Sequence, residues 1–411
     1  MTETGFGKRR FDASAAHAPT QPLRLPPILA AARDAPTATA EPKYHGPICT
    51  IGILAGLILI FAAQEIFALG GVAYSFNYRS LLAFGGNGLS LIQQGQWWRL
   101  FTAPLLHGNP GHIIGNGIVL ALVGLRFEKL IGWGWFLAVF FVSALGGDLV
   151  SIYSQDPHMI GVGASGAIMG LLACMLVCSF HTAAKGQQIK MRWLALRVMI
   201  PALLPLGGAG EHGGLLVDYS AHAGGAAAGV VMGLLMNALW PQGDSKPVMG
   251  LLAEWLGVAG LLATIASFVL IAVHFPAYQA INATLAPDAQ IPSDQTQAIA
   301  AGDDLFARYP KDPRAHLYVA LSDGKAGLYS ATTSELTTAL SETDQLSELP
   351  PQTGPGLHLL LALALLQQGD RDGAQAAAVA ACSYAFPTPK TKETLNKFGL
   401  CGPVSGVNFG S

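Results

Sequence analysis

The sequence predicts an all-α membrane protein: a bundle of seven transmembrane helices followed by a soluble, mostly helical domain. Of its 411 residues, 51% are hydrophobic and 12% are charged, whereas a soluble domain usually devotes about a quarter of its residues to charge. Apolar stretches long enough to cross a bilayer recur through the middle of the chain, and charged residues concentrate on either side of this region. The net charge is −2 and there is no long basic run, which argues against a nucleic-acid partner.

The apolar stretches define the expected organisation of the chain. They are residues 48–69, 112–130, 133–151, 165–182, 193–209, 219–240 and 250–275. Residues 1–47 are polar and rich in Ala and Pro, without a visible cleavable signal peptide, so we expect a disordered cytoplasmic segment followed by an anchoring first span. We expect a six-helix core over 48–240, a linker and seventh helix over 241–275, and a soluble domain over 276–411.

The positions of Lys and Arg beside the spans predict the orientation in the cell (inner) membrane, because cytoplasmic loops are enriched in these residues. Basic residues precede the first span and follow the second and fourth, whereas residues 152–164 and 210–218 contain none. We therefore expect a cytoplasmic N-terminus and, after seven spans, an extracytoplasmic domain at 276–411.

The last 136 residues are expected to be soluble and helical, with amphipathic stretches at Gly302–Leu321 and Gly356–Ala381. The segments 308–313 and 368–374 are typical of turns in helical hairpins, although two irregular copies do not define a repeat. The domain is either a helical module without a catalytic role or a docking site for a protein partner. In it, Cys382 and Cys401 either form a disulfide or stay free.

Polar side chains inside apolar spans are the candidates for function, because they are costly in lipid. The second span begins with His112 and Asn116, the fourth with Ser165, and the sixth with His222. All three spans enter from the outer side, so at about 1.5 Å per residue these side chains can share one depth. We expect them to meet below the outer surface of the membrane.

These residue types fit acyl transfer. Ser165 can act as a nucleophile if a neutral imidazole such as His222 takes its proton. Free backbone N–H groups at a helix N-terminus, together with His112 and Asn116, can donate to the oxyanion. Small residues on both helices, Gly166 in the fourth span and Gly225 in the sixth, would allow the close approach that brings the serine and the histidine together.

Each signal also has a structural interpretation. Gly and Ser are common in membrane helices for packing alone, and an intramembrane histidine is commonly a packed, hydrogen-bonded residue. His112 and Asn116 could form a structural pair or half of a metal site, but no carboxylate or cysteine nearby in the sequence completes one, so we expect no metal.

Five motifs in this order resemble those of the rhomboid family of intramembrane serine proteases, across roughly residues 49–240. They are Trp98-Arg99, His107-x4-His112-x3-Asn116, Gly124-x3-Glu128-x3-Gly132, Gly163-Ala-Ser165-Gly166 and Ala221-His222-x2-Gly225-x3-Gly229. The seventh span resembles the six-plus-one variant of this fold, in which an extra helix follows the catalytic six.

The resemblance implies hydrolysis of peptide bonds in or near the membrane segments of other proteins by a Ser165–His222 dyad, without a cofactor. It implies an oxyanion hole made by His112, Asn116 and the Ser165 amide, with Gly163 letting the preceding loop approach the scissile carbonyl.

Supporting roles are also implied. They fall to Gly166 and Gly225 in helix packing, to His107 in shaping the first loop, and to Met169, which stands where some members place an aromatic ring against the catalytic histidine. Asp218 is expected to be structural.

Two other classes of function compete with this hypothesis. A catalytically silent relative could bind membrane clients and use its tail for docking, but such relatives typically lack the serine or the histidine. A transporter would place charged or broken-helix sites near the bilayer midplane, whereas the polar residues here lie toward one surface.

Overall fold

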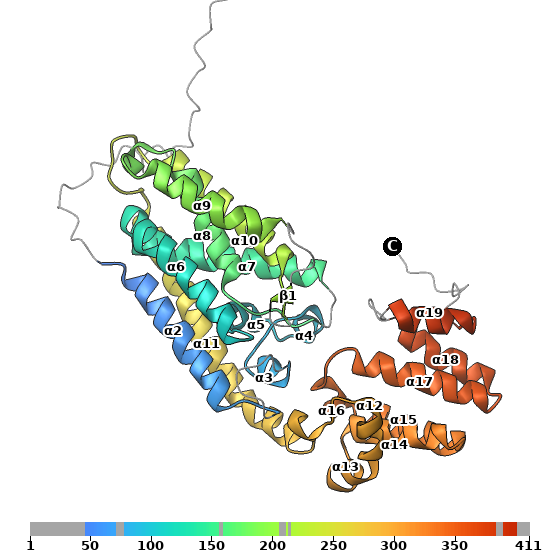
Figure 1. Cartoon of the computed structure of the whole chain (residues 1–411). Helices are drawn as coiled ribbons and strands as arrows, with labels where there is room; N and C mark the ends of the chain where they lie inside the picture. The colour runs from blue at the N-terminus through green and yellow to red at the C-terminus, as the bar shows by residue number, and fades with distance from the viewer. Residues whose placement is uncertain are drawn as a thin grey trace, which may run out of the picture. The chain divides into compact units, whose positions relative to one another are not determined.

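The computed structural model describes residues 46–70, 78–155, 159–204, 211–212, 215–383 and 389–400 (Figure 1). Contacts divide the chain into two units, Met1–Glu41 and Pro42–Ser411. Residues 1–45, which hold nearly all of the segment expected to be disordered, lie outside the described residues.

A helix lies in each of the seven predicted spans of the described chain. These helices are α2 (Ile48–Ile66), α6 (Pro110–Ile131), α7 (Trp133–Ser154), α8 (Ser165–Cys178), α9 (Gln188–Leu203), α10 (Tyr219–Leu239) and α11 (Gly250–Asn282). Within the described residues, α2, α7, α10 and α11 are long and apolar enough to cross a membrane by length and composition. The prediction of an all-α, membrane-embedded bundle is confirmed.

Helix α8 lies at the centre of this bundle, where it packs against α6, α7, α9 and α10. Most of its residues are fully buried by protein. Its 14 residues span about 21 Å at 1.5 Å each, against roughly 30 Å for the hydrocarbon core. A helix this short cannot reach both membrane surfaces, so its N-terminal residue can lie within the membrane.

Glycines allow α8 and α10 to touch through their backbones. A Cβ atom added to Gly225 would lie 2.0 Å from the Gly166 carbonyl oxygen, and one added to Gly229 would lie 2.1 Å from that of Gly170. Such distances exclude any side chain, so the close approach predicted from the glycine spacing is present.

The long loop between α2 and α6, which we call L1 (residues 70–109), contains short helices. These are α3 (Tyr78–Ala83), α4 (Leu89–Gln93), α5 (Arg99–Thr102) and the 3₁₀ turn η1 (Ala103–Leu105). Two of its arginines, Arg79 and Arg99, are 2% and 1% exposed. The remaining short elements are η2 (Thr182–Ala184), η3 (Asp288–Gln290) and an antiparallel pair, β1 (Glu211–His212) with β2 (Leu215–Leu216).

Several helix boundaries differ from those expected. Helix α11 continues through Pro276 to Asn282, seven residues beyond the predicted end, because its final turns are held by contacts that hydropathy does not register. At the predicted end, the Phe275 ring packs edge-on against Phe84, and His274 stacks on Trp98. Beyond it, Tyr278 accepts from Arg99, and Asn282 accepts from Arg79. Helix α9 begins five residues before the predicted span, and residues 205–209 of that span lie outside the described residues.

The tail is helical, as predicted. It comprises α12 (Gln295–Ala300), α13 (Gly302–Arg308), α14 (Pro313–Lys325), α15 (Tyr329–Ser341), α16 (Thr343–Ser347), α17 (Thr353–Gln367), α18 (Arg371–Ser383) and α19 (Pro389–Lys397). Each of the two predicted amphipathic stretches forms two helices that pack against each other, α13 with α14 and α17 with α18. The breaks lie at the segments expected to form hairpin turns. Cys382 is disulfide-bonded, while Cys401 lies outside the described residues.

Candidate active site

Ser165 is the first residue of α8, and the loop before it is held by L1. Asn87 and Gly161 exchange two backbone hydrogen bonds, of 3.1 and 2.8 Å, and the Gly163 N–H donates to the Ala103 carbonyl at 2.9 Å. Gly163 has a φ of +121°, a conformation that side chains disfavour. This turn, which only glycine adopts readily, therefore places Ser165 at a helix N-terminus, where N–H groups lack intrahelical partners.

His222 lies in the first turn of α10 and is 8% exposed. The Asp218 carboxylate caps this helix by accepting from the Ala221 N–H at 2.8 Å. His222 Nδ1 lies 2.7 Å from the Ala202 carbonyl oxygen. A carbonyl can only accept, so in the neutral ring Nδ1 carries the proton and Nε2 has a free lone pair. The ring is therefore held in the tautomer that a general base requires.

The Ala202 carbonyl is available to His222 because it lies in the last turn of α9, which ends at Leu203. The final four carbonyls of a helix have no intrahelical partner. Thus α9 contributes the backbone acceptor that orients the histidine.

The backbones beside Ser165 and His222 are in contact. A Cβ on Gly166 would lie 3.2 Å from the Ala221 carbonyl oxygen, and one on Gly147 of α7 would lie 2.8 Å from this oxygen and 3.3 Å from Gly166 Cα. Among the residues that the structure describes, no hydrogen bond joins Ser165 Oγ to His222. Apo geometries of this kind are often loose and tighten in the substrate complex.

The predicted oxyanion residues converge on Gly163. A Cβ on Gly163 would lie 2.8 Å from His112 Nε2 and 3.6 Å from Asn116 Nδ2. The His112 ring is also within electrostatic range of His222. Asn109 caps α6 by accepting from the His112 N–H at 2.8 Å, with Pro110 at the first helical position, which fixes the helix turn that carries His112.

His107 supports this cluster from a buried position. Its ring is buried, packs edge-on against His112 at 4.9 Å between centroids, and lies with Nε2 3.0 Å from Asn116 Nδ2. The Gln64 side chain of α2 bonds both the N–H and the carbonyl of His107, each at 3.2 Å. The amide of Asn116 is therefore oriented through His107 and α2.

Met169 is buried in the central apolar cluster. The aromatic ring beside His222 comes from Tyr219, one turn earlier on α10, with ring centroids 6.3 Å apart at 80°. Asp218, besides capping α10, accepts from Gln155 Nε2 at 3.2 Å and from Ser151 Oγ of α7. The carboxylate thus ties two helices together, which agrees with its expected structural role.

Sequence reasoning missed Gln64, Asp148 and the Ala202 carbonyl. Asp148 could have been found, since it is an acidic residue within the apolar stretch 133–151. Its carboxyl lies near the Asn87 side chain, and its Oδ2 is buried without a partner among the described residues. Ala202 has no side-chain signal, because the group that acts is its backbone oxygen.

Comparison with known proteins gives a consistent result. Residues 94–238 match the family model of the rhomboid domain. The chain is 31% identical over 235 residues to the rhomboid protease GluP of Bacillus subtilis (strain 168), covering 57% of this chain and 42% of that protein. It is 34% identical over 158 residues to RHOMBOID-like protein 5 of Arabidopsis thaliana, covering 37% and 48%.

A third relative is the rhomboid protease AarA of Providencia stuartii, 29% identical over 175 residues, covering 38% of this chain and 61% of that protein. The chain thus spans about half the length of the curated relatives it matches. The matched region contains the residues that converge at α6, α8 and α10, and residues 94–238 therefore carry a rhomboid domain.

Proposed function

We propose that this protein is an intramembrane serine endopeptidase with Ser165 as nucleophile and His222 as general base. The observation that carries the proposal is the Nδ1 hydrogen bond of His222 to Ala202. This bond leaves the Nε2 lone pair of His222 free to accept a proton. The residue before His222, Ala221, contacts Gly166, the residue after Ser165.

In the proposed reaction, Ser165 Oγ attacks the scissile carbonyl carbon while His222 Nε2 takes the hydroxyl proton. The negative charge on the carbonyl oxygen is stabilised by His112, Asn116 and the Ser165 amide. The imidazolium then protonates the leaving amine as the C–N bond breaks. Water attacks the acyl-enzyme, His222 accepts its proton, and the Ser165 hydroxyl is restored.

The proposed substrates are the membrane segments of other proteins. A regular helix keeps its carbonyls in hydrogen bonds, so a segment must unwind locally before Ser165 can attack. Small or helix-destabilising residues near the cut favour this step. We also propose the orientation predicted from Lys and Arg, with a cytoplasmic N-terminus and residues 276–411 outside.

Cleavage of a single-span membrane protein by the purified chain in detergent tests the activity. We expect Ser165→Ala and His222→Ala each to abolish cleavage, because each removes a group that makes or breaks a bond. Ser154→Ala, an exposed serine at the end of α7, should cleave at the wild-type rate. Full activity of Ser165→Ala would falsify the dyad, and an inactive wild-type protein that still binds membrane clients would favour the silent alternative.

The orientation is tested separately, with a reporter enzyme that is active only after export. Fused after residue 411, the reporter should be active in cells. Fused instead between α8 and α9, after Gly186, it should be silent. The reverse pattern would contradict the proposed orientation without bearing on the dyad.

A further inference from the structure

The extended end of α11 holds L1 through ring contacts and hydrogen bonds of its side chains. Beyond the two ring contacts of Phe275 and His274, Arg99 Nη2 donates to Tyr278 Oη at 2.6 Å. The same guanidinium donates from Nη1 to the Leu82 and Gly86 carbonyls, at 2.7 and 2.9 Å. Arg99 therefore fixes the segment after α3 and joins it to α11.

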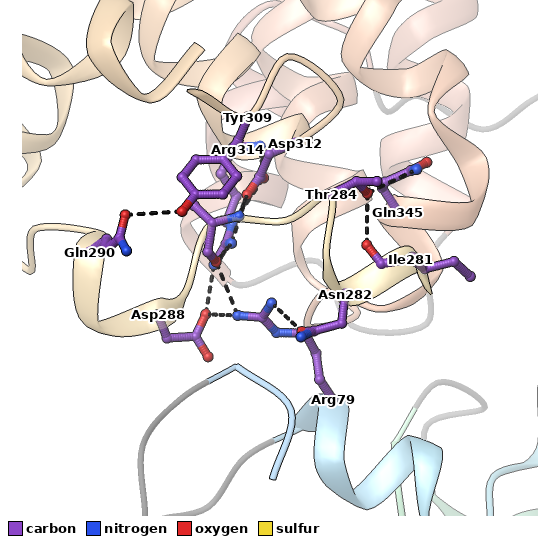
Figure 2. Close-up of polar contacts among 11 residues, drawn as sticks. Arg79, Ile281, Asn282, Thr284, Asp288, Gln290, Tyr309, Asp312, Arg314 and Gln345 are labelled. Carbon is purple, nitrogen blue, oxygen red and sulfur yellow. Dashed lines mark hydrogen bonds and ion pairs between the residues drawn. The ribbon is translucent and has the colours of Figure 1, made fainter. Parts of the chain in front are cut away.

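A second buried arginine, Arg79 of α3, joins L1 to the last residue of α11 and to residues that follow this helix (Figure 2). Its guanidinium donates to Asn282 Oδ1 at 2.8 Å and to the Ala286 carbonyl at 3.3 Å, and it forms an ion pair with Asp288. The Asp288 N–H also donates to the Gly70 carbonyl at 3.0 Å. Both the side chain and the backbone of Asp288 thus contact L1.

The tail holds these acceptors in place. Arg314 of α14 bonds Asp288 and Asp312 at 2.7 Å each, and donates to the Ala286 carbonyl at 2.6 Å. Asp312 is fully buried and accepts from the Ala286 N–H at 2.8 Å. Two guanidinium groups and two carboxylates balance in charge, as a buried network of ions requires.

Contacts already described connect Arg79 to the nucleophile. Arg79 lies on α3, and Arg99 bonds the carbonyl of Leu82 in this helix and that of Gly86 just after it. Next along the chain is Asn87, which pairs with Gly161. Gly161 and Gly163 set the turn that starts α8 at Ser165. A displacement of α3 would therefore move the loop before Ser165 through the pairing of Asn87 with Gly161.

We propose that residues 282–314 of the tail act as an intramolecular clamp on L1, and that Arg79 is a positioning residue for the loop that presents Ser165. The inference rests on the proposed protease function. The proposal gives the tail a structural role toward the site, which it supports through L1. This role is separate from any binding of a protein partner by the tail.

Steady-state cleavage of a single-span membrane protein by the full-length chain in detergent tests the clamp. We expect Arg79→Gln and Asp288→Asn each to lower kcat at least about tenfold with KM little changed, because misplacement of the attacking group slows the chemical step. The double variant should be no slower than the slower single one, since both remove one interaction. Arg79→Lys should recover part of the rate, because it keeps the charge but cannot reproduce all the bonds made by the two terminal guanidinium nitrogens.

Two tail variants that do not touch L1 serve as matched controls. Asp304→Asn removes an exposed ion pair with Arg308, and Glu335→Gln removes the carboxylate charge that faces His316 inside the tail. Both should keep the wild-type kcat. If Glu335→Gln slowed the enzyme as Asp288→Asn did, general loss of tail packing would explain the effect and the clamp would be wrong.

The rate at which a fluorophosphonate labels Ser165 gives a second measurement that needs no membrane substrate. It should fall in parallel with kcat in Arg79→Gln and Asp288→Asn. If Arg79→Gln fails to fold, Asp288→Asn decides, because that side chain is 44% exposed and its loss is tolerable. Wild-type kcat and labelling in Asp288→Asn, with activity still dependent on Ser165, would overturn the clamp and leave the protease proposal intact.

Discussion

At the scale of single residues, Glu128 shows how a charge is accommodated inside this bundle. Helix α2 starts after Pro47 without a side-chain cap of its own. The Glu128 carboxylate of α6 accepts instead from the N–H groups of Cys49 and Thr50, at 2.9 and 2.8 Å, and from Thr50 Oγ1 at 2.6 Å. A carboxylate at a helix N-terminus also interacts favourably with the helix dipole, so one buried acid joins two membrane helices.

Removing this cap should destabilise the bundle. We expect Glu128→Ala to lower the free energy of unfolding by about 2 kcal/mol or more, because three hydrogen bonds to a charged acceptor are lost. Glu128→Gln should cost less, since one amide oxygen can still accept. Thermal unfolding in detergent measures both, and equal stability of the alanine variant and the wild type would contradict the role of the cap.

At the scale of elements, the sequence locates the helices and the start of α8, but not where α11 ends or what the end of α9 does. The start of α8 at Ser165 and the glycine faces of α8 and α10 were predictable from the sequence, because apolar length and small-residue spacing record them directly. The end of α11 was not, since its last turns depend on contacts with L1 residues far away in the sequence. The role of α9 was not predictable either, because the group that orients His222 is a backbone carbonyl.

The glycine contact between α8 and α10 yields a prediction at this scale. Gly225→Ala should separate the two helices, because the added methyl would overlap the Gly166 carbonyl. We expect a lower melting temperature and loss of Ser165 labelling by a fluorophosphonate. Gly56→Ala is the matched control, since that membrane-helix glycine has nothing within 4 Å of an added Cβ, and it should behave as the wild type does.

At the scale of the whole molecule, the tail is more closely tied to the membrane bundle than its composition indicates. The sequence separates residues 276–411 as a soluble domain, but ion pairs between distant segments leave no trace in hydropathy. Glu348 of the tail is a further group that hydropathy does not connect to the bundle. It is 2% exposed, and it lies within electrostatic range of Arg79, Arg99, Tyr78 and Tyr278.

Burial raises the pKa of Glu348 from 4.5 to about 8, against the opposing effect of Arg99 and Arg79. Between these two values the folded protein keeps a proton that the unfolded chain has lost, so the contribution of Glu348 to stability falls as pH rises from about 4.5 to 8. We expect Glu348→Gln to remove this slope. Melting temperatures at pH 5, 7 and 9 measure it, and parallel curves for the two proteins would show that Glu348 does not retain its proton.

The acceptor that orients His222 has a further consequence. Because it belongs to the peptide backbone of Ala202, no single side-chain replacement in α9 deletes it, and a conventional alanine scan of that helix would pass over it. Only a change in where α9 terminates can move this oxygen. The protonation pattern of the proposed base is therefore protected from most point mutations. It is sensitive to insertions or deletions near the end of α9, which would rotate the last carbonyls away from the imidazole.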